Sequence, residues 1–367
     1  MSAAGNTVRR AAPALLGLAL LAGCGATPRG GPGLAEVGAY LPATWVGGEA
    51  AGPLVVTHGG VGSPPDWSGD CLRAAGLALV ALEQGGSPLD AAVVGTLILE
   101  EYPRFNAGTG ANIRLDGRSI QMDAAVMTSE GRFGAVAVIE RVRNPVAVAR
   151  ALLDTPHLLL AGEGATRFAH AAGFADELPT CPEAEAKYRQ RIAALLAGQA
   201  GEGYETFDWR RYWNYPGPIP SELAAPAAGD SVLKTDPGPH DTVGTVARGG
   251  NGRFAATLST GGTSLTLYGR VGDVPIYGAG CYAGPAGAVA CTGFGEEIIR
   301  QAMARTVYDL LARGVPAREA VRRGCALFPA DAALGLIAVD ARGWGVAANR
   351  PMAYGQAAAT TSSTSAR

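Results

Sequence analysis

The stretch from residue 240 to 273 constrains this chain more than any other part of its 367 residues. Its threonine, Thr242, follows a polar segment rich in glycine and proline and precedes an apolar run that predicts a buried strand. A threonine hydroxyl is a weak nucleophile unless a base lies beside it. If the bond between Asp241 and Thr242 is cut, the new α-amine can be that base, because its pKa of about 7.7–8.0 leaves a useful fraction neutral at pH 7.

The same hydroxyl can make the cut. Attack of the Thr242 oxygen on the preceding carbonyl passes through a five-membered ring and gives an ester, which water then opens. We therefore hypothesise that one side chain serves first in maturation and then in turnover.

The composition is that of a globular protein with a substantial core, since 48% of the residues are hydrophobic and 17% are charged. The formal net charge is −2 and no basic run is present, which argues against a nucleic-acid partner. Apart from Cys24, five cysteines remain, without a CxxC spacing, so a disulfide framework is not indicated. Cys281 and Cys291 are expected to be buried free thiols.

Periodicity predicts alternating groups of strands and helices. Apolar residues at helical spacing indicate helices over 70–84, 88–101, 144–153, 164–170, 183–196, 296–311 and 317–327. Short apolar runs indicate strands over 54–57, 120–126, 134–140, 157–160, 243–247, 253–258, 276–281, 288–292, 335–340 and 344–347. Runs of strands and then of helices in each half favour sheets packed face to face with helices outside.

Several motifs occur in a fixed order. Those from Thr242 onward are TVG at 242–244, STGG at 259–262, GRVGD at 269–273 and CTGFG at 291–295. Those before it are HGG at 58–60, FNAG at 105–108 and NP at 144–145. Together they resemble the isoaspartyl peptidase/L-asparaginase family, the plant-type asparaginases, which are N-terminal nucleophile (Ntn) hydrolases. The resemblance covers roughly residues 54–175 and 240–345.

The resemblance implies an α+β fold, the four-layer αββα sandwich of Ntn hydrolases, in which Thr242 starts a central strand. It implies an α-subunit over 53–241, with a mobile linker over 172–239, and a β-subunit over 242–354. The low-complexity residues 355–367 predict a disordered tail. An aromatic cluster at 207–213, FDWRRYW, is not explained by the family and either packs over the site or buries itself.

The resemblance also implies the catalytic residues. Thr242 is the expected nucleophile, and Thr260 lies at the spacing of a second threonine that hydrogen-bonds the first. The Thr292 hydroxyl and the Gly293 N–H are expected to form the oxyanion hole. Asn106 is expected to face the site, although an asparagine can also serve a turn.

A substrate with a free amino-acid end needs a cation for its carboxylate and an anion for its ammonium. Arg270 and Asp273 offer both within four residues, because arginine can bind a carboxylate bidentately and aspartate can pair with the ammonium. The alternative for such a pair is a local salt bridge. The backbone of Gly295, like that of Gly293, is a further expected substrate contact.

These residues imply hydrolysis of β-aspartyl (isoaspartyl) dipeptides and of the side-chain amide of L-asparagine, releasing L-aspartate through a β-aspartyl-threonine ester. Some positions depart from the family pattern. Asp241 replaces a glycine, as in the related glycosylasparaginases, and NRPM at 349–352 lacks the family's motif, which leaves the leaving group open. Two alternatives therefore remain: a glycosylasparaginase, and an inactive, uncleaved lipoprotein that binds amino acids.

The resemblance implies one ion, a structural sodium in the loop after the second helix, and no other cofactor. A hard cation suits oxygen ligands, and the expected ligands are the backbone carbonyls of Leu99, Glu100, Tyr102, Phe105, Ala107 and Thr109. The four histidines are scattered, which predicts no catalytic transition metal. His58 is expected to have a positioning role. The resemblance further implies self-association of αβ units as a dimer.

The N-terminus predicts export. Arg9 and Arg10 precede a short apolar run, residues 11–22, that is typical of a signal peptide. LAGC at 21–24 resembles the bacterial lipobox, which implies a signal peptide over 1–23, lipidation of Cys24 and a flexible tether over 24–52. The expected location is the cell envelope, with a lipid anchor in the membrane, on the periplasmic side of the outer membrane or at the cell surface. An uncleaved apolar terminus or a wrongly assigned start codon is the alternative.

Overall fold

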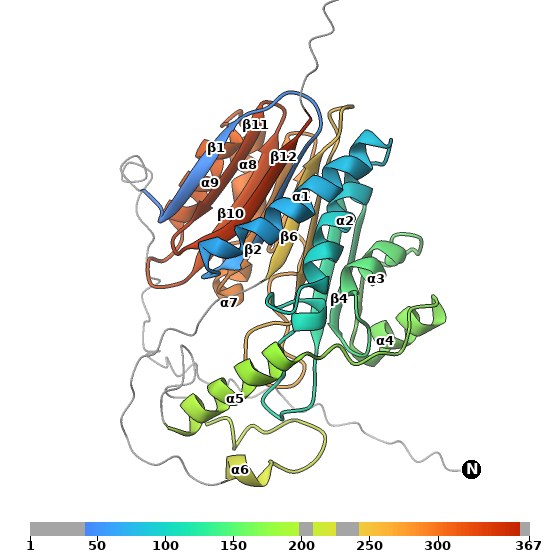
Figure 1. Ribbon diagram of the computed structural model, residues 1–367, viewed down its shortest axis with the longest axis vertical. Coiled ribbons are helices and arrows are strands. Elements are labelled where there is room, and N and C mark those ends of the chain that lie inside the picture. Colours follow the sequence, from blue (N-terminus) through green and yellow to red (C-terminus); the bar gives the residue numbers. More distant parts are fainter. Residues whose placement is uncertain (1–40, 198–207, 225–241, 360–367) are drawn as a thin grey trace, which may run out of the picture. The chain divides into compact units, whose positions relative to one another are not determined.

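Two β-sheets lie face to face, and helices cover the outer face of each (Figure 1). The computed structural model describes residues 41–197, 208–224 and 242–359, all within one compact unit, residues 31–367. Its four layers are helices, sheet, sheet and helices. This is the αββα sandwich of the predicted α+β class.

The larger sheet has seven strands in the order β12-β2-β6-β7-β3-β4-β5. Neighbouring strands are antiparallel except β4 and β5, which are parallel. The central position of β6 matters most, because this strand begins one residue after Thr242. The strands are β2 (Leu54–Val61), β3 (Met122–Thr128), β4 (Phe133–Ile139), β5 (Leu159–Ala161), β6 (Val243–Arg248), β7 (Phe254–Thr260) and β12 (Met352–Ala358).

The smaller sheet has five antiparallel strands in the order β1-β11-β10-β9-β8. They are β1 (Thr44–Glu49), β8 (Cys281–Gly284), β9 (Gly287–Gly293), β10 (Leu334–Asp340) and β11 (Gly343–Ala348). Contacts of β10 with β2 and of β9 with β6 hold the two sheets together.

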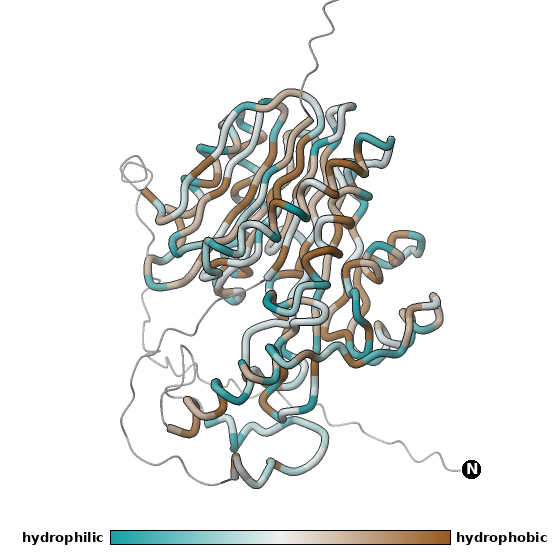
Figure 2. The backbone as a smooth tube through the Cα atoms, viewed as in Figure 1, coloured by the Kyte–Doolittle hydropathy of each residue, from teal (hydrophilic) through white to brown (hydrophobic). Residues whose placement is uncertain are grey.

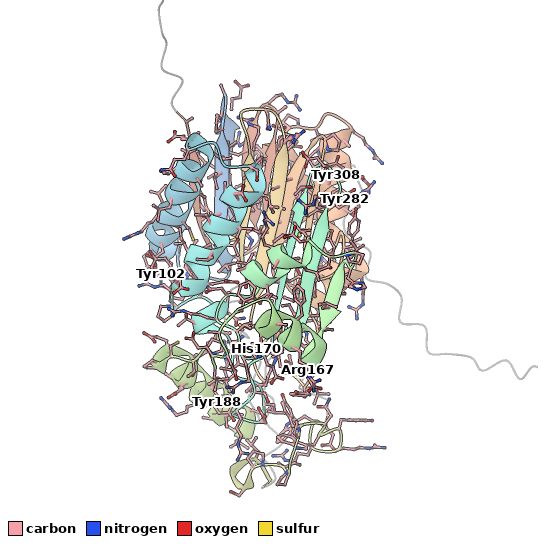
Figure 3. The ribbon with its side chains drawn as sticks, turned by 90° about the vertical axis from the view of Figure 1, so that its right-hand side faces the viewer. Tyr102, Arg167, His170, Tyr188, Tyr282 and Tyr308 are labelled. Carbon is pink, nitrogen blue, oxygen red and sulfur yellow. The ribbon has the colours of Figure 1, made fainter. Side chains whose placement is uncertain are left out.

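Helices form the two outer layers. Over the larger sheet lie α1 (Ser68–Glu83), α2 (Pro88–Glu101), α3 (Pro145–Leu152) and α4 (Gly162–Ala171). Over the smaller sheet lie α8 (Met303–Ala312) and α9 (Ala317–Leu327), preceded by the short α7 (Gly295–Arg300). Tyr282 of β8 and Tyr308 of α8 show this packing, with ring centroids 4.6 Å apart (Figure 3). Apart from these layers, α5 (Pro182–Leu196) and α6 (Ser221–Ala224) belong to a separate small cluster.

Apolar side chains fill the space between the layers. In Figure 2, hydrophobic residues, coloured brown on the backbone tube, occur along the strands and along the helices that cover them. Side chains of a strand alternate between its two faces. In β6, Val246 therefore packs between the sheets while Ala247 packs against the helices. Burying a side chain such as valine contributes about 1.5–3 kcal/mol, so this alternation fixes the register of the strand.

Several predicted boundaries are wrong. The tether was expected to reach residue 52, but Thr44–Glu49 form β1, whose backbone pairs with β11 along the edge of the smaller sheet. The tail was expected to begin at residue 355, but β12 continues to Ala358 because its backbone pairs with β2. Within the linker expected over 172–239, α5 and α6 are helical, and α5 was predicted as a helix.

Three predicted elements also differ in detail. Of the strand expected over 276–281, only Cys281 is in β8, because the preceding residues form turns. The helix expected over 296–311 is divided at Ala302, whose φ is 44°, a left-handed conformation that interrupts a helix. The strand expected over 157–160 is the short β5, which is partly exposed rather than buried.

Some predictions fall outside the described residues. These are the signal peptide, Cys24, the tether up to residue 40, residues 198–207 and 225–239 of the linker, Asp241, and the tail from residue 360. Within the described ranges, no helix has the length and apolar character needed to cross a membrane.

Candidate active site

Three predicted threonines lie where neighbouring strands of the two sheets end. Thr242 precedes β6, Thr260 is the last residue of β7, and Thr292 is the second-last residue of β9. Each shares a strand face with residues of the core between the sheets, because alternate side chains point the same way. The strand register therefore directs all three side chains into the space between the sheets.

The Thr242 and Thr260 hydroxyls are in contact, as the sequence predicted. The Thr242 Oγ1 donates a hydrogen bond to the Thr260 Oγ1 over 3.2 Å, and the Gly262 N–H donates to the same oxygen over 3.0 Å. Both threonines are almost fully buried, with 7% and 4% of their surfaces exposed. The contact fixes the Thr242 oxygen at the end of its strand.

Two asparagines hold the turn that follows Thr260. The side-chain amides of Asn106 and Asn112 each donate to the Gly262 carbonyl over 2.6 Å. The Asn106 side chain also accepts from the Asn112 N–H over 2.8 Å, so the two residues form one network. Both line a hollow of about 420 Å³, counting its open mouth. Asn106 thus faces the site and also serves a turn, so both sequence interpretations hold.

The hollow brings together most of the predicted residues. Around its wall are Asn106, Asn112, Thr242, Thr260, Gly262, Thr263, Ser264, Arg270, Gly272, Asp273 and Gly293. Hydroxyls, a guanidinium and a carboxyl therefore meet around one small volume, which suits a small polar molecule.

Arg270 is held by Glu296, a residue that sequence analysis did not single out. The guanidinium donates to both carboxylate oxygens of Glu296, over 3.0 and 2.8 Å. Burial alone would raise the pKa of Glu296, but its hydrogen bonds with Arg270 lower it. The local salt bridge of Arg270 with Asp273, the alternative considered above, is not among the ion pairs formed by the described residues.

Asp273 is buried at the base of this arrangement, with 5% of its surface exposed. Its Oδ2 atom has no hydrogen-bond partner among the described residues. Burial raises the pKa of Asp273 to about 7; nearby Asp123 and Glu296 add to this rise, and Arg270 opposes it. With this pKa the Asp273 carboxyl is partly ionised at pH 7, and a positively charged partner beside it would favour the ionised form.

Thr292, Gly293 and Gly295 lie at or just after the end of β9, which reaches the hollow at Gly293. The Thr292 hydroxyl oxygen accepts from the Val61 N–H over 3.2 Å, which ties β9 to β2. Gly293 lines the hollow, and its φ of 143° suits glycine alone. At Gly295 a Cβ would come within 2.9 Å of the Asp273 Oδ1 atom, so glycine leaves room for the carboxyl. Thr292 and Gly295 are not among the lining residues.

His58 lies in β2, the strand beside β6 in the larger sheet, and is fully buried. It pairs with Gly244 across β2 and β6, and a Cβ on Gly244 would come within 2.5 Å of the His58 Nε2 atom. Burial lowers the pKa of His58 to about 3, an effect that the Thr242 backbone opposes. The imidazole is therefore neutral at pH 7 and packs against the strand that carries Thr242.

The loop expected to hold sodium has features that suit a cation. The Thr109 Oγ1 atom is buried and has no hydrogen-bond partner among the described residues. At Gly110 a Cβ would lie 2.1 Å from the Phe105 carbonyl oxygen and 2.4 Å from that of Pro103, so oxygens gather here. Hard cations prefer such oxygens. The other expected ligands end α2 or follow it: Leu99, Glu100, Tyr102 and Ala107.

Asn112, Glu296 and the wall residues Thr263 and Ser264 were missed. Asn112 could have been found from its position, because a polar residue between the apolar Ala111 and Ile113 suggests a side chain that faces a site. Glu296 lies next to CTGFG but pairs across 26 positions, and this contact depends on the fold. No sequence signal distinguished Thr263 or Ser264.

A threonine just before a central strand, in a sandwich of two sheets between two helix layers, defines the class of Ntn hydrolases. The comparisons with known proteins agree. The family described as asparaginase matches residues 53–366. The chain therefore belongs to the asparaginase family and is a hydrolase, as its motifs predicted.

Named relatives share much of the chain. A plant-type L-asparaginase of Pyrococcus abyssi is 37% identical over 302 residues, covering 79% of this chain and 90% of the relative. An isoaspartyl peptidase/L-asparaginase of Danio rerio is 34% identical over 303 residues, covering 79% and 87%. An isoaspartyl peptidase of Salmonella typhimurium is 39% identical over 236 residues, covering 64% and 67%.

Proposed function

We propose that this protein hydrolyses the side-chain amide of L-asparagine and the β-aspartyl bond of isoaspartyl dipeptides, releasing L-aspartate. The observation that carries the proposal is the meeting of Thr242, Arg270 and Asp273 around one hollow. A nucleophile, a cation and an anion within that hollow match an aspartyl group with a free α-carboxylate and a free α-ammonium. The names of the relatives support the same substrates.

The first step of the proposal is self-cleavage between Asp241 and Thr242. The Thr242 hydroxyl oxygen attacks the Asp241 carbonyl, the C–N bond breaks, and the nitrogen receives the hydroxyl proton. Water then hydrolyses the resulting ester, which leaves a carboxylate on Asp241 and a free hydroxyl and amine on Thr242. The buried contact with Thr260 supports this step because it restricts the oxygen to one position.

In turnover, Arg270 binds the α-carboxylate of the substrate and Asp273 pairs with its ammonium. The α-amine of Thr242 takes the hydroxyl proton as the oxygen attacks the side-chain carbonyl of the substrate. The leaving amine takes that proton and departs, and a β-aspartyl ester remains on Thr242. Water hydrolyses the ester, which releases L-aspartate and restores the hydroxyl.

The negative charge that develops on the carbonyl oxygen needs donors. We assign this role to the Thr292 hydroxyl and the Gly293 N–H, with the Gly295 backbone as a further substrate contact. Removing one such donor typically costs about 2.7–4 kcal/mol of transition-state stabilisation. The support is the position of Gly293 in the wall of the hollow and of Thr292 beside it on β9.

The remaining assignments rest on the sequence and on the loop described above. We propose a structural sodium held by the carbonyls of the 99–109 loop, and no other cofactor. We also propose that Cys24 carries a lipid, which anchors the protein in the bacterial cell envelope, on the periplasmic side of the outer membrane or at the cell surface. Association of αβ units as a dimer completes the proposal.

A denaturing gel combined with an assay for aspartate tests the proposed function. Purified wild-type protein is expected to give two fragments, the smaller beginning at Thr242, and to release L-aspartate from L-asparagine and from β-Asp-Leu. Thr242→Ala is expected to stay one chain and to lose at least about 10³-fold in activity, since it lacks the nucleophile.

Two outcomes would contradict the proposal. A single full-length wild-type band without aspartate release would instead support an inactive amino-acid-binding lipoprotein. Cleavage of glycoasparagine with little activity on β-Asp-Leu would support a glycosylasparaginase, in line with the aspartate at position 241.

A further inference from the structure

Residues 208–224, which we call the aromatic segment, lie against the loop that carries Arg270. We call that loop, residues 261–272, the clamp loop. Its first part, Gly262 to Ser264, and its last part, Arg270 to Gly272, line the hollow. Between them, Leu265, Thr266 and Tyr268, which are not among the residues that line the hollow, contact the aromatic segment.

Asn214 binds the clamp loop through its backbone. The side-chain amide of Asn214 donates to the Tyr268 carbonyl over 2.8 Å, and its oxygen accepts from the Tyr268 N–H over 3.1 Å. Tyr268 lies within a turn closed by a hydrogen bond from the Arg270 N–H to the Leu267 carbonyl, 3.2 Å long. Asn214 therefore holds both polar backbone groups of a residue inside the turn that ends at Arg270.

Tyr215 adds a second attachment. Its buried hydroxyl donates to the Thr266 carbonyl and accepts from the Leu115 N–H over 3.0 Å. The ring packs edge-on against Tyr268, with centroids 5.5 Å apart. One phenol thus joins the clamp loop to the chain segment at Leu115.

The clamp loop needs support here because its own conformation is unfavourable. Leu265 has a φ of 59°, in the left-handed region that non-glycine residues rarely adopt. Its side chain is buried in an apolar cluster with Leu115, Trp209, Tyr215 and other residues. Tyr188 of α5, which is labelled in Figure 3, also packs against this cluster. Burial in this cluster offsets the strain at Leu265.

Other contacts hold the clamp loop to residues 114–123, a segment that leads into β3 of the larger sheet. The Arg114 guanidinium donates to the Thr266 Oγ1 atom, the Gly269 N–H donates to the Gln121 side chain over 2.7 Å, and the Gly272 N–H donates to Asp123 over 3.2 Å. The aromatic segment contacts the loop at Leu265, Thr266 and Tyr268, all of which precede the Gly269 and Gly272 anchors in the sequence.

We propose that the aromatic segment is a brace that positions Arg270 for the α-carboxylate of the substrate, and so sets KM. The inference rests on the proposed function for the role of Arg270, but the brace itself is a contact that can be measured alone. Because residues 208–224 precede Thr242, the brace belongs to the upstream fragment and Arg270 to the downstream one. Scission would thus leave the substrate clamp of one fragment supported by the other.

The test compares Tyr215→Phe with Tyr212→Phe, the same change on a ring that is half exposed and three residues away. Tyr215→Phe is expected to raise KM for L-asparagine about three- to tenfold, with kcat within about twofold, because the hydrogen bonds of the hydroxyl with Thr266 and Leu115 are lost away from the reacting atoms. Tyr212→Phe is expected to leave both constants unchanged. If Tyr215→Phe folds poorly, Asn214→Ala serves as the second variant. It removes the two hydrogen bonds with Tyr268, and because Asn214 is exposed it leaves the buried cluster intact.

Hydrogen exchange measured by mass spectrometry gives a second readout that needs no substrate. Faster exchange across residues 262–272 is expected in Tyr215→Phe and Asn214→Ala but not in Tyr212→Phe. Unchanged KM and unchanged exchange in both variants would overturn the brace, and so would a fall in kcat with KM unchanged. If wild-type protein released no aspartate, the proposed function would fail, and the exchange data alone would still decide the brace.

Discussion

At the scale of single residues, the protonation of Asp273 links the site to stability. Burial raises its pKa to about 7 in the folded protein, against an ordinary value of 3.8. Between these values the folded state binds a proton that the unfolded state has lost. The free energy of unfolding therefore falls as the pH rises from about 4 to 7, and the penalty of the buried charge is fully present above that range.

Replacing Asp273 by asparagine should remove this dependence. The comparison is made in the Thr242→Ala background, which is expected to remain one chain. The difference in unfolding free energy between the Asp273→Asn protein and the protein that keeps Asp273 should shift by about 2–4 kcal/mol in favour of Asp273→Asn when the pH is raised from 4.5 to 8. Urea unfolding at the two pH values measures the change, and any effect of the substitution that is independent of pH cancels. A gain that is equal at both pH values would show that Asp273 titrates normally.

At the scale of elements, the periodicity of apolar residues predicted the strands and helices whose formation depends on their own sequence. Strand 243–247 corresponds to β6, whereas the contact of Thr242 with Thr260 was an implication of the family resemblance. The edge strands β1 and β12 were missed because backbone pairing with β11 and β2 forms them. Glu296 was missed for a similar reason, since its partner is distant in sequence. Long-range contacts leave weak signals in one sequence.

The strand β6 also yields a prediction, because Gly244 lies where two sheets and a histidine meet. A Cβ at this position would come within 2.4 Å of the Leu258 side chain and 2.5 Å of His58. Gly244→Ala is therefore expected to lower the free energy of unfolding by about 1–3 kcal/mol and to slow scission by shifting Thr242. Urea unfolding and a time course on denaturing gels measure both effects.

The matched control is Gly76→Ala in α1, where an added Cβ meets nothing within 4 Å. Alanine is the better helix former, so this variant is expected to gain about 0.5–1 kcal/mol and to mature at the wild-type rate. A Gly244→Ala protein as stable as wild type would mean that the strands move apart easily at this point.

At the scale of the whole molecule, scission at residue 242 would divide both sheets between two fragments. In the larger sheet, β2 of the upstream fragment lies between β12 and β6 of the downstream one, and β7 pairs with β3. In the smaller sheet, upstream β1 pairs with downstream β11. Neither fragment contains a complete sheet. The core between the two sheets and the core between the larger sheet and its helices both draw side chains from the two fragments.

The two fragments are therefore expected to stay together as one folded unit after cleavage. Separating them would expose backbone groups along three strand pairs of the larger sheet, together with the apolar surface between layers. The free energy needed for this is comparable to that of unfolding the protein. Size-exclusion chromatography of mature protein, diluted to nanomolar concentration without denaturant, should give one peak containing both fragments. Separate peaks should arise only in urea, at the concentration that also abolishes the circular dichroism of the fold. Two peaks in plain buffer would mean that the interleaved strands do not hold the halves together.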